Sequence, residues 1–141
     1  MVTIQVRYDG GLRCTSVHGP SQVKLVTDAP VDNMGKGMSF SPTDLVATAL
    51  GTCVLTTMAI VADRNGWRID GTEATVEKHM VADPLRRIGK LVVSIRMHGE
   101  LDARARETLE KTAHTCPVRM SLAANVEVPM TFEWSAHRAR A

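Results

Sequence analysis

The first part of the chain alternates between apolar and polar residues, which is typical of strands with one buried face. Three such stretches cover residues 2–8, 12–17 and 23–27. Asp9-Gly10-Gly11 separates the first two, and glycine readily adopts the positive φ that a hairpin turn needs. The pattern therefore predicts a hairpin and a third strand. We expect residues 28–40, rich in proline, asparagine and glycine, to form an irregular loop.

A long stretch without charged residues follows, from residue 45 to residue 62. In the segment before it, Ser41 is expected to cap a helix, Pro42 to take its first position and Asp44 to return to the cap as in a capping box. Gly66 is expected to end this helix. Because the helix is apolar nearly all round, it should be buried, and so short a chain has few elements to cover it. The pattern favours a homodimer with a shared core.

The second half of the chain predicts further strands and two shorter helices. Strands are expected over residues 72–81, 90–98 and 126–134. Asp102 is a plausible cap for a helix that carries Ala105, Leu109 and Ala113 on one face. A short helix should start at Cys116-Pro117, because proline belongs at a helix start. The chain therefore predicts one α+β domain over residues 1–135, followed by a frayed tail at residues 136–141.

Composition narrows the possible partners. A chain of 141 residues with 44% hydrophobic and 23% charged residues is ordinary for a soluble domain. The net charge of +2 and the five aromatic residues give no basic, base-stacking surface, so no nucleic-acid partner is expected. The segment 45–62 is long enough for a membrane span, but its four threonines, Gly51 and the capped start favour a globular helix.

The three cysteines bear on both compartment and chemistry. An odd number argues against a disulfide framework, and the first residues form a strand pattern rather than a signal peptide, so we expect a cytoplasmic protein. No His and Cys spacing matches a metal-ligand pattern, so no metal is expected. Cys53 lies in the apolar helix, where a cysteine is ordinarily a core residue. Cys116 precedes Pro117 at a helix start, a position that lowers a thiol pKa. Cys14 has no motif around it, although it lies beside Arg13.

Together these motifs resemble those of the OsmC/Ohr family of osmotically inducible and organic-hydroperoxide-resistance proteins. The resemblance rests on Ser41-Pro42-Thr43-Asp44-Leu45, on Ala49-Leu50-Gly51-Thr52-Cys53 and on Cys116-Pro117-Val118, in this order. It extends over nearly the whole chain, and it implies curved antiparallel sheets wrapped around a long central helix in an intertwined homodimer.

The resemblance also implies a two-cysteine peroxidase, an oxidoreductase that acts in the oxidative stress response. Cys53 would be the peroxidatic thiolate that forms a sulfenic acid, and Cys116 would resolve it as a disulfide. An external dithiol would then reduce the disulfide, without a bound cofactor. The family supplies an arginine from the first hairpin, for which Arg13 is the first choice and Arg7 the second. Apolar residues near Cys53 would favour organic hydroperoxides over hydrogen peroxide, namely Val46, Leu50, Val54 and Met58.

One position departs from the peroxidase pattern. In the peroxidase branches a glutamate directly follows the proline, whereas here Thr43 follows Pro42 and the acid is Asp44. One helical step rotates a side chain by about 100 degrees, so Asp44 need not face the same site. Asp44 can therefore either replace the family glutamate or only cap the helix. The alternative function is a dimer that binds or senses a small molecule and has little peroxidase activity.

Overall fold

The computed structural model describes residues 1–135, so the predicted tail at 136–141 lies outside the described residues. Over the described part the chain is α+β, as predicted, and its helices and strands follow the predicted order. They form two compact units, Met1–Val46 and the chain from Ala47 onward. One domain over residues 1–135 stays a prediction.

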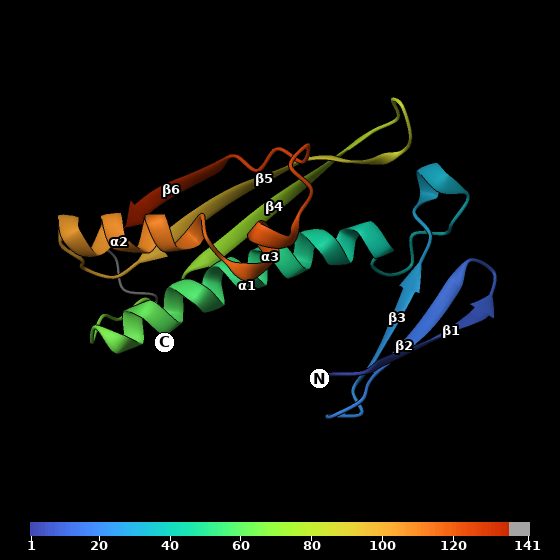
Figure 1. Cartoon of the computed structure of the whole chain (residues 1–141), viewed down its shortest axis with the longest axis horizontal. Coiled ribbons are helices and arrows are strands. Elements are labelled where there is room, and N and C mark those ends of the chain that lie inside the picture. Colours follow the sequence, from blue (N-terminus) through green and yellow to red (C-terminus); the bar gives the residue numbers. More distant parts are fainter. Residues whose placement is uncertain (136–141) are drawn as a thin grey trace. The chain divides into compact units, whose positions relative to one another are not determined.

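The first unit contains a three-stranded antiparallel sheet in the order β1-β2-β3 (Figure 1). The strands are β1 (Ile4–Gly10), β2 (Arg13–His18) and β3 (Lys24–Asp28). The predicted hairpin is confirmed: Gly10 and Gly11 have φ of 89° and 59°, which glycine adopts at little cost. The register shifts between Tyr8 and Gly10, so Asp9 forms a bulge beside the turn.

The loop after β3 is more regular than predicted. Val31–Asn33 form a 3₁₀ helix, so the expectation of an entirely irregular loop is wrong there. Backbone hydrogen bonds also tie this loop to its surroundings. The amide of Asp28 donates to the carbonyl of Phe40 at 3.1 Å. The amide of Ala29 donates to the carbonyl of Leu12 at 3.2 Å.

The long predicted helix is α1 (Pro42–Arg64). Its start is a reciprocal capping box, as predicted. The Ser41 amide donates to Asp44 Oδ2 at 2.8 Å, and the Asp44 amide donates to Ser41 Oγ at 3.1 Å. At its other end Gly66 has a φ of 70°, the left-handed conformation in which many helices end.

Only one face of α1 is buried within the single chain. The buried residues follow the spacing of one helix face, three or four positions apart except for the adjacent Leu50 and Gly51: Ala47, Leu50, Gly51, Val54, Met58 and Ala62. On the other face Thr52 and Thr56 are exposed, and 47% of Ile60 is exposed. This agrees with the expectation that one chain has too few elements to cover the helix on all sides. By length and composition alone α1 could also cross a membrane, a test that core helices of soluble proteins pass as well.

The second unit packs a mixed sheet beside α1 (Figure 1). Its strands are β4 (Glu73–Val81), β5 (Arg87–His98) and β6 (Met130–Ser135). β4 and β5 are antiparallel, but β5 and β6 are parallel, so the expectation of purely antiparallel sheets is corrected here. A Cβ on Gly51 would lie 3.0 Å from Val76 Cγ2, so glycine permits a close approach of α1 to β4.

Two shorter helices complete this unit. In α2 (Ala103–Ala113), Asp102 caps the start by accepting from the Ala105 amide at 2.8 Å. Its predicted apolar face is confirmed as buried: Ala105, Leu109 and Ala113. α3 (Pro117–Ser121) begins directly after Cys116, as predicted, although it ends two residues earlier than expected.

Candidate thiol site

The second unit brings the two motif cysteines together. Cys53 lies in the middle of α1, and Cys116 is the cap residue of α3, 63 positions later in the chain by their residue numbers. The two thiols are close enough for Cys53 to raise the pKa of Cys116, and each thiol is free rather than in a disulfide. Two thiols in contact can be joined by oxidation without any metal or cofactor. The proximity of the two thiols therefore makes this part of the unit the candidate thiol site.

Cys53 is the more accessible of the two thiols. Its side chain is half-buried, because Cys53 borders the buried stripe of α1 rather than lying on it. Thr57, one turn later, places its hydroxyl 3.9 Å from Cys53 Sγ and donates a hydrogen bond to the Cys53 carbonyl at 2.7 Å. Because the only hydroxyl proton is used in that bond, Thr57 Oγ1 faces the sulfur as an acceptor.

Cys116 is buried, with no exposed surface. Its sulfur accepts a hydrogen bond from the Arg119 amide at 3.3 Å, the capping bond of α3. Burial nevertheless raises the pKa of Cys116, and the neighbouring Cys53 raises this pKa further, against the opposing effect of the Arg119 amide. The expectation that the helix start would lower this thiol pKa is therefore wrong, because desolvation outweighs the capping bond.

The predicted acid and arginines lie in the first unit. Asp44 Oδ2 is engaged by the Ser41 amide, the local role that its sequence position allowed. Arg13 is the first residue of β2 and is half-buried. Arg7 forms an exposed ion pair with Asp9, with a distance of 2.7 Å between Nε and Oδ1. Arg7 is thus paired with Asp9 at the surface. Arg13 therefore remains the better candidate for the arginine that the family resemblance implies.

The residues predicted to line a substrate pocket are mostly core residues. Leu50, Val54 and Met58 have no exposed surface, and only Val46 is half-exposed. Their spacing places the three buried side chains on the stripe of α1 that packs in the core. Their role in a substrate pocket stays a prediction, and it would require the core to open there.

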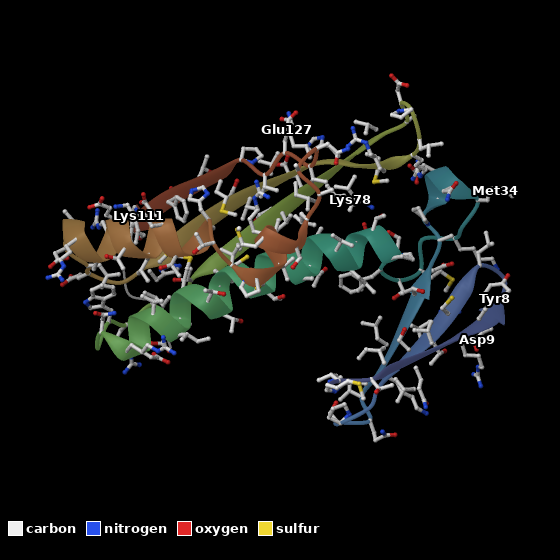
Figure 2. The ribbon with its side chains drawn as sticks, in the orientation of Figure 1. Tyr8, Asp9, Met34, Lys78, Lys111 and Glu127 are labelled. Atoms are coloured by element: carbon white, nitrogen blue, oxygen red, sulfur yellow. The ribbon has the colours of Figure 1, made fainter. Side chains whose placement is uncertain are left out.

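Lys78 is a half-buried cation on β4 that was not among the predicted site residues. Along β4, residues 74, 76, 78 and 80 are half-buried and alternate with exposed residues. Val76 approaches Gly51 of α1, so Lys78 lies on the same side of the strand, toward the helix (Figure 2). The signal was available in the sequence, because the alternation that turns Val76 inward also turns Lys78 inward.

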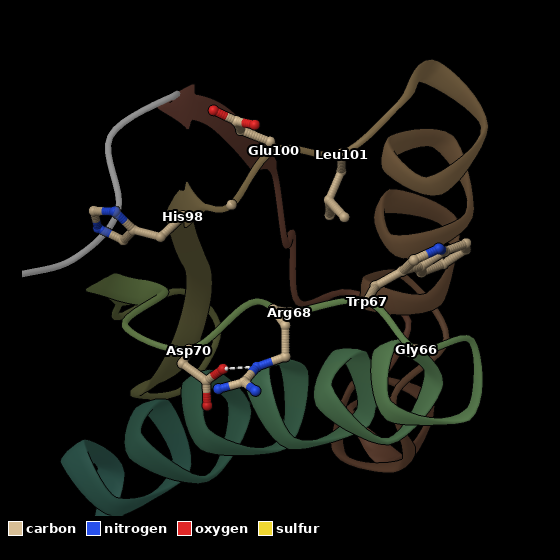
Figure 3. Close-up of a pocket in the computed structure, with 8 residues that line it drawn as sticks. Gly66, Trp67, Arg68, Asp70, His98, Glu100 and Leu101 are labelled. Atoms are coloured by element: carbon tan, nitrogen blue, oxygen red, sulfur yellow. Dashed lines mark hydrogen bonds and ion pairs between the residues drawn. The ribbon is translucent and has the colours of Figure 1, made fainter. Parts of the chain in front are cut away.

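A hollow of about 690 Å³ lies at the end of α1 (Figure 3). Charged and polar side chains line it together with Trp67 and Leu101, and Arg68 and Asp70 form an ion pair across 2.7 Å. The Arg68 guanidinium lowers the pKa of Asp70. Both side chains are largely exposed, and neither Cys53 nor Cys116 lines this hollow. The hollow is therefore a solvated surface feature separate from the thiols.

Within residues 1–135, no three or more His, Cys, Asp or Glu side chains are grouped so that they could hold a metal ion. His114 instead packs edge-on against Phe132, with ring centroids 6.1 Å apart. The Nε2 atom of His79 lies 3.4 Å from Oε2 of Glu77, which is on the same strand.

Comparisons with known proteins agree with this fold. Residues 35–131 match the sequence profile of a family described as OsmC-like protein. No curated protein matches the chain. One similar solved structure is a Psychrobacter arcticus protein described as an osmotic stress induced and detoxification response protein. It is 42% identical, with a TM-score of 0.89, over 94% of this chain and 96% of the other.

Two further solved structures are more distant. An organic hydroperoxide resistance protein OsmC from Legionella pneumophila is 23% identical, with a TM-score of 0.73, over 94% of this chain and 96% of the other. The organic hydroperoxide resistance protein OhrB of Bacillus subtilis is 19% identical, with a TM-score of 0.67, over 94% of this chain and 98% of the other. At these identities the likeness concerns the fold alone.

Proposed function

This chain belongs to the OsmC-like protein family, and we propose that it is a thiol-dependent peroxidase that reduces organic hydroperoxides. The observation that carries the proposal is the proximity of Cys53 and Cys116, which the fold brings together from distant parts of the chain. A peroxidase of this kind needs one thiol to attack the peroxide and a second within reach to form a disulfide. Two similar structures are named as organic hydroperoxide resistance proteins, which favours the same substrate class.

The environments of the two thiols support a division of roles. Cys53 is half-exposed and can meet a substrate, whereas Cys116 is fully buried. The raised pKa of Cys116 keeps this thiol mostly protonated at neutral pH, and a protonated thiol is a poor nucleophile toward peroxide. These features favour Cys53 as the peroxidatic residue and Cys116 as the resolving residue.

The reaction then has three balanced steps. The Cys53 thiolate attacks the O–O bond of the hydroperoxide, and with one proton this yields a sulfenic acid and an alcohol. The Cys116 thiol attacks the sulfenic sulfur, which forms the disulfide and releases water. An external dithiol reduces the disulfide and leaves as its own disulfide. In this proposal Arg13 is the cation that favours the Cys53 thiolate, and no bound cofactor is needed.

A homodimer is part of the same proposal. One face of α1 is uncovered in the single chain, and β1 exposes an apolar row of Ile4, Val6 and Tyr8. Alternate residues of a strand share a face, so these three side chains form one apolar surface. A second copy of the chain would cover such surfaces, as the family resemblance implies. A reducing cytoplasm remains our proposed location.

The test is turnover of cumene hydroperoxide with dithiothreitol as reductant. We expect Cys53→Ser to abolish turnover and Cys116→Ser to give one stoichiometric reaction that leaves a sulfenic acid on Cys53, detectable by dimedone labelling and mass spectrometry. Cys14→Ser is the matched control and should retain activity. Turnover by the Cys53→Ser protein would overturn the assignment of roles.

The second candidate is a small-molecule binding or sensing dimer with little peroxidase activity. The observation that favours it is the capping bond of Asp44 at 2.8 Å, together with Thr43 at the position of the family glutamate. A carboxylate committed to the helix start is less available to hold an arginine at a thiolate. Wild-type protein that binds organic hydroperoxides or fatty acids, but shows no turnover with any dithiol, would favour this candidate.

A further inference from the structure

Two oppositely charged side chains of the first unit lie opposite each other across a strand pair. Arg13 of β2 and Asp28 of β3 are direct partners in the antiparallel register. Directly opposed residues project from the same face of a sheet, with Cβ atoms about 5 Å apart. Asp28 is also the last residue of its strand, and Arg13 is the first of its own. The two residues therefore lie opposite each other at one end of the β2–β3 strand pair.

Each of the two side chains has a buried polar atom without a hydrogen-bond partner. Asp28 is only 1% exposed, and its Oδ2 accepts from the Met38 amide at 2.9 Å, but its Oδ1 has no partner. The Nε of Arg13 is buried and also has none. A buried donor or acceptor left unpaired costs about 1–3 kcal/mol, and more when the group is charged. One donor and one acceptor, unpaired on facing residues, are complementary.

The other acids considered for Arg13 are already engaged. Asp9, at the same end of the hairpin (Figure 2), accepts from Arg7 Nε through Oδ1 and from the Thr15 hydroxyl through Oδ2. Asp44 Oδ2 accepts from the Ser41 amide. Asp28 is the one of these three acids with a buried oxygen that lacks a donor.

We propose that Asp28 is the positioning residue for Arg13: the two side chains are not hydrogen-bonded to each other in this structure, and they pair when the guanidinium donates its Nε proton to Oδ1. Arginine has five N–H donors in a planar fork, so this bond fixes the plane and leaves both terminal nitrogens to bind an anion. The Met38 amide holds the other carboxylate oxygen and so prevents Asp28 from turning away. The inference rests on the proposed function only in that the anion served by Arg13 is the Cys53 thiolate.

The bond itself can be tested without any enzyme assay. In the full-length protein, the Nε–H signal of Arg13 is observed by nitrogen-15 NMR and assigned by its loss in Arg13→Lys. We expect this proton to exchange with water at least tenfold more slowly than those of exposed arginines, and the protection to vanish in Asp28→Asn. The matched control, Asp32→Asn in the 3₁₀ helix of the same loop, should leave the signal unchanged. Fast exchange of the Arg13 proton in the wild type would overturn the inference, even if Asp28→Asn failed to fold.

The positioning role is tested by the pH dependence of Cys53 alkylation with iodoacetamide. Loss of a nearby negative charge alone would move the midpoint of the rate profile to lower pH. Loss of a positioned guanidinium would move it to higher pH and slow alkylation at neutral pH by about tenfold, since small misplacements of a stabilising group are costly. We expect the upward shift in Asp28→Asn and no shift in Asp32→Asn. A downward shift or none would reject the positioning role.

These readouts separate the two proposals. If the wild type reduces no hydroperoxide, the peroxidase proposal fails, while the NMR signal and the alkylation profile still report on Asp28. If turnover is present but both readouts are unaffected by Asp28→Asn, the peroxidase proposal stands and the positioning role of Asp28 is rejected.

Discussion

At the scale of single residues, the two motif thiols differ because their surroundings differ. Cys116 is wholly buried, and burial raises its pKa even though the Arg119 amide donates to its sulfur. A short helix start offers few amide donors, whereas removal of water from a thiolate acts on all of its surface. Cys53 keeps part of its surface exposed. Exposure, more than the local motif, therefore distinguishes the two cysteines.

The raised pKa of Cys116 predicts how stability depends on pH. In the unfolded chain this thiol titrates near its reference pKa of about 8.5, and in the folded chain it titrates higher. Above pH 8.5 or so the unfolded chain therefore releases a proton that the folded chain holds. We expect the free energy of unfolding to fall from there up to the folded-state pKa, by at most about 1.4 kcal/mol per pH unit. Below this pH range the contribution of the Cys116 thiol to the free energy of unfolding is fully present.

Urea denaturation between pH 7 and pH 10 measures this effect. Cys116→Ala should lose this part of the pH dependence, while Cys14→Ala, the control on β2, should keep it. Identical slopes for the wild type and Cys116→Ala above pH 8.5 or so would contradict the prediction.

At the scale of elements, α1 has a locally stabilised start and a middle that positions Cys53. Its start is stabilised locally by the reciprocal bonds of Ser41 and Asp44, and its middle places Cys53 beside the stripe buried against the second sheet. Gly51 permits the close approach of α1 to Val76 of β4. A bulkier residue would require the valine to shift. The position of Cys53 thus depends on packing two residues away, at Gly51, as well as on the helix itself.

The capping box predicts a small and purely structural role for Asp44. Asp44→Asn should lower the free energy of unfolding by about 1 kcal/mol or less, because the amide oxygen can still accept from Ser41 while the favourable charge at the helix start is lost. Hydroperoxide turnover and the pH profile of Cys53 alkylation should not change. A strong loss of activity with little loss of stability would show instead that Asp44 has taken the place of the family glutamate.

At the scale of the whole molecule, apolar surface in the single chain favours self-association. Val6 and Tyr8 on β1 are 65% and 64% exposed, and Ile60 on α1 is 47% exposed. Scattered apolar residues are normal on a surface, but a strand face and a helix face of this kind are typical of a contact with another chain. A homodimer would bury them.

We therefore expect light scattering to give twice the chain mass of 15.4 kDa. Val6→Asp should weaken the dimer and lower its thermal stability in a concentration-dependent way, because folding and association are then coupled. Lys24→Asp, an exposed change on β3, is the matched control for introducing a carboxylate into this sheet. A well-folded wild-type monomer, with a melting temperature that does not change on dilution, would contradict this prediction.

Much of the local structure was predictable from the sequence. The hairpin, the capping box, the caps at Asp102 and Cys116 and the buried face of α2 all depend on residues within a few positions of one another. Short-range steric limits and hydrogen bonds determine such features, so the order of residues is sufficient to predict them. The motif order around the two cysteines likewise indicated the family before any geometry was known.

Contacts between distant segments could be decided only by the tertiary structure. Three of these concern the second unit: the parallel pairing of β5 with β6, the proximity of Cys53 and Cys116, and the burial that raises the pKa of Cys116. The fourth is the facing pair of Arg13 and Asp28, whose unpaired atoms are visible only once the register of β2 and β3 is known. Each of these four features depends on which surfaces are buried against each other. That burial is determined by the packing of the whole chain and not by any one segment.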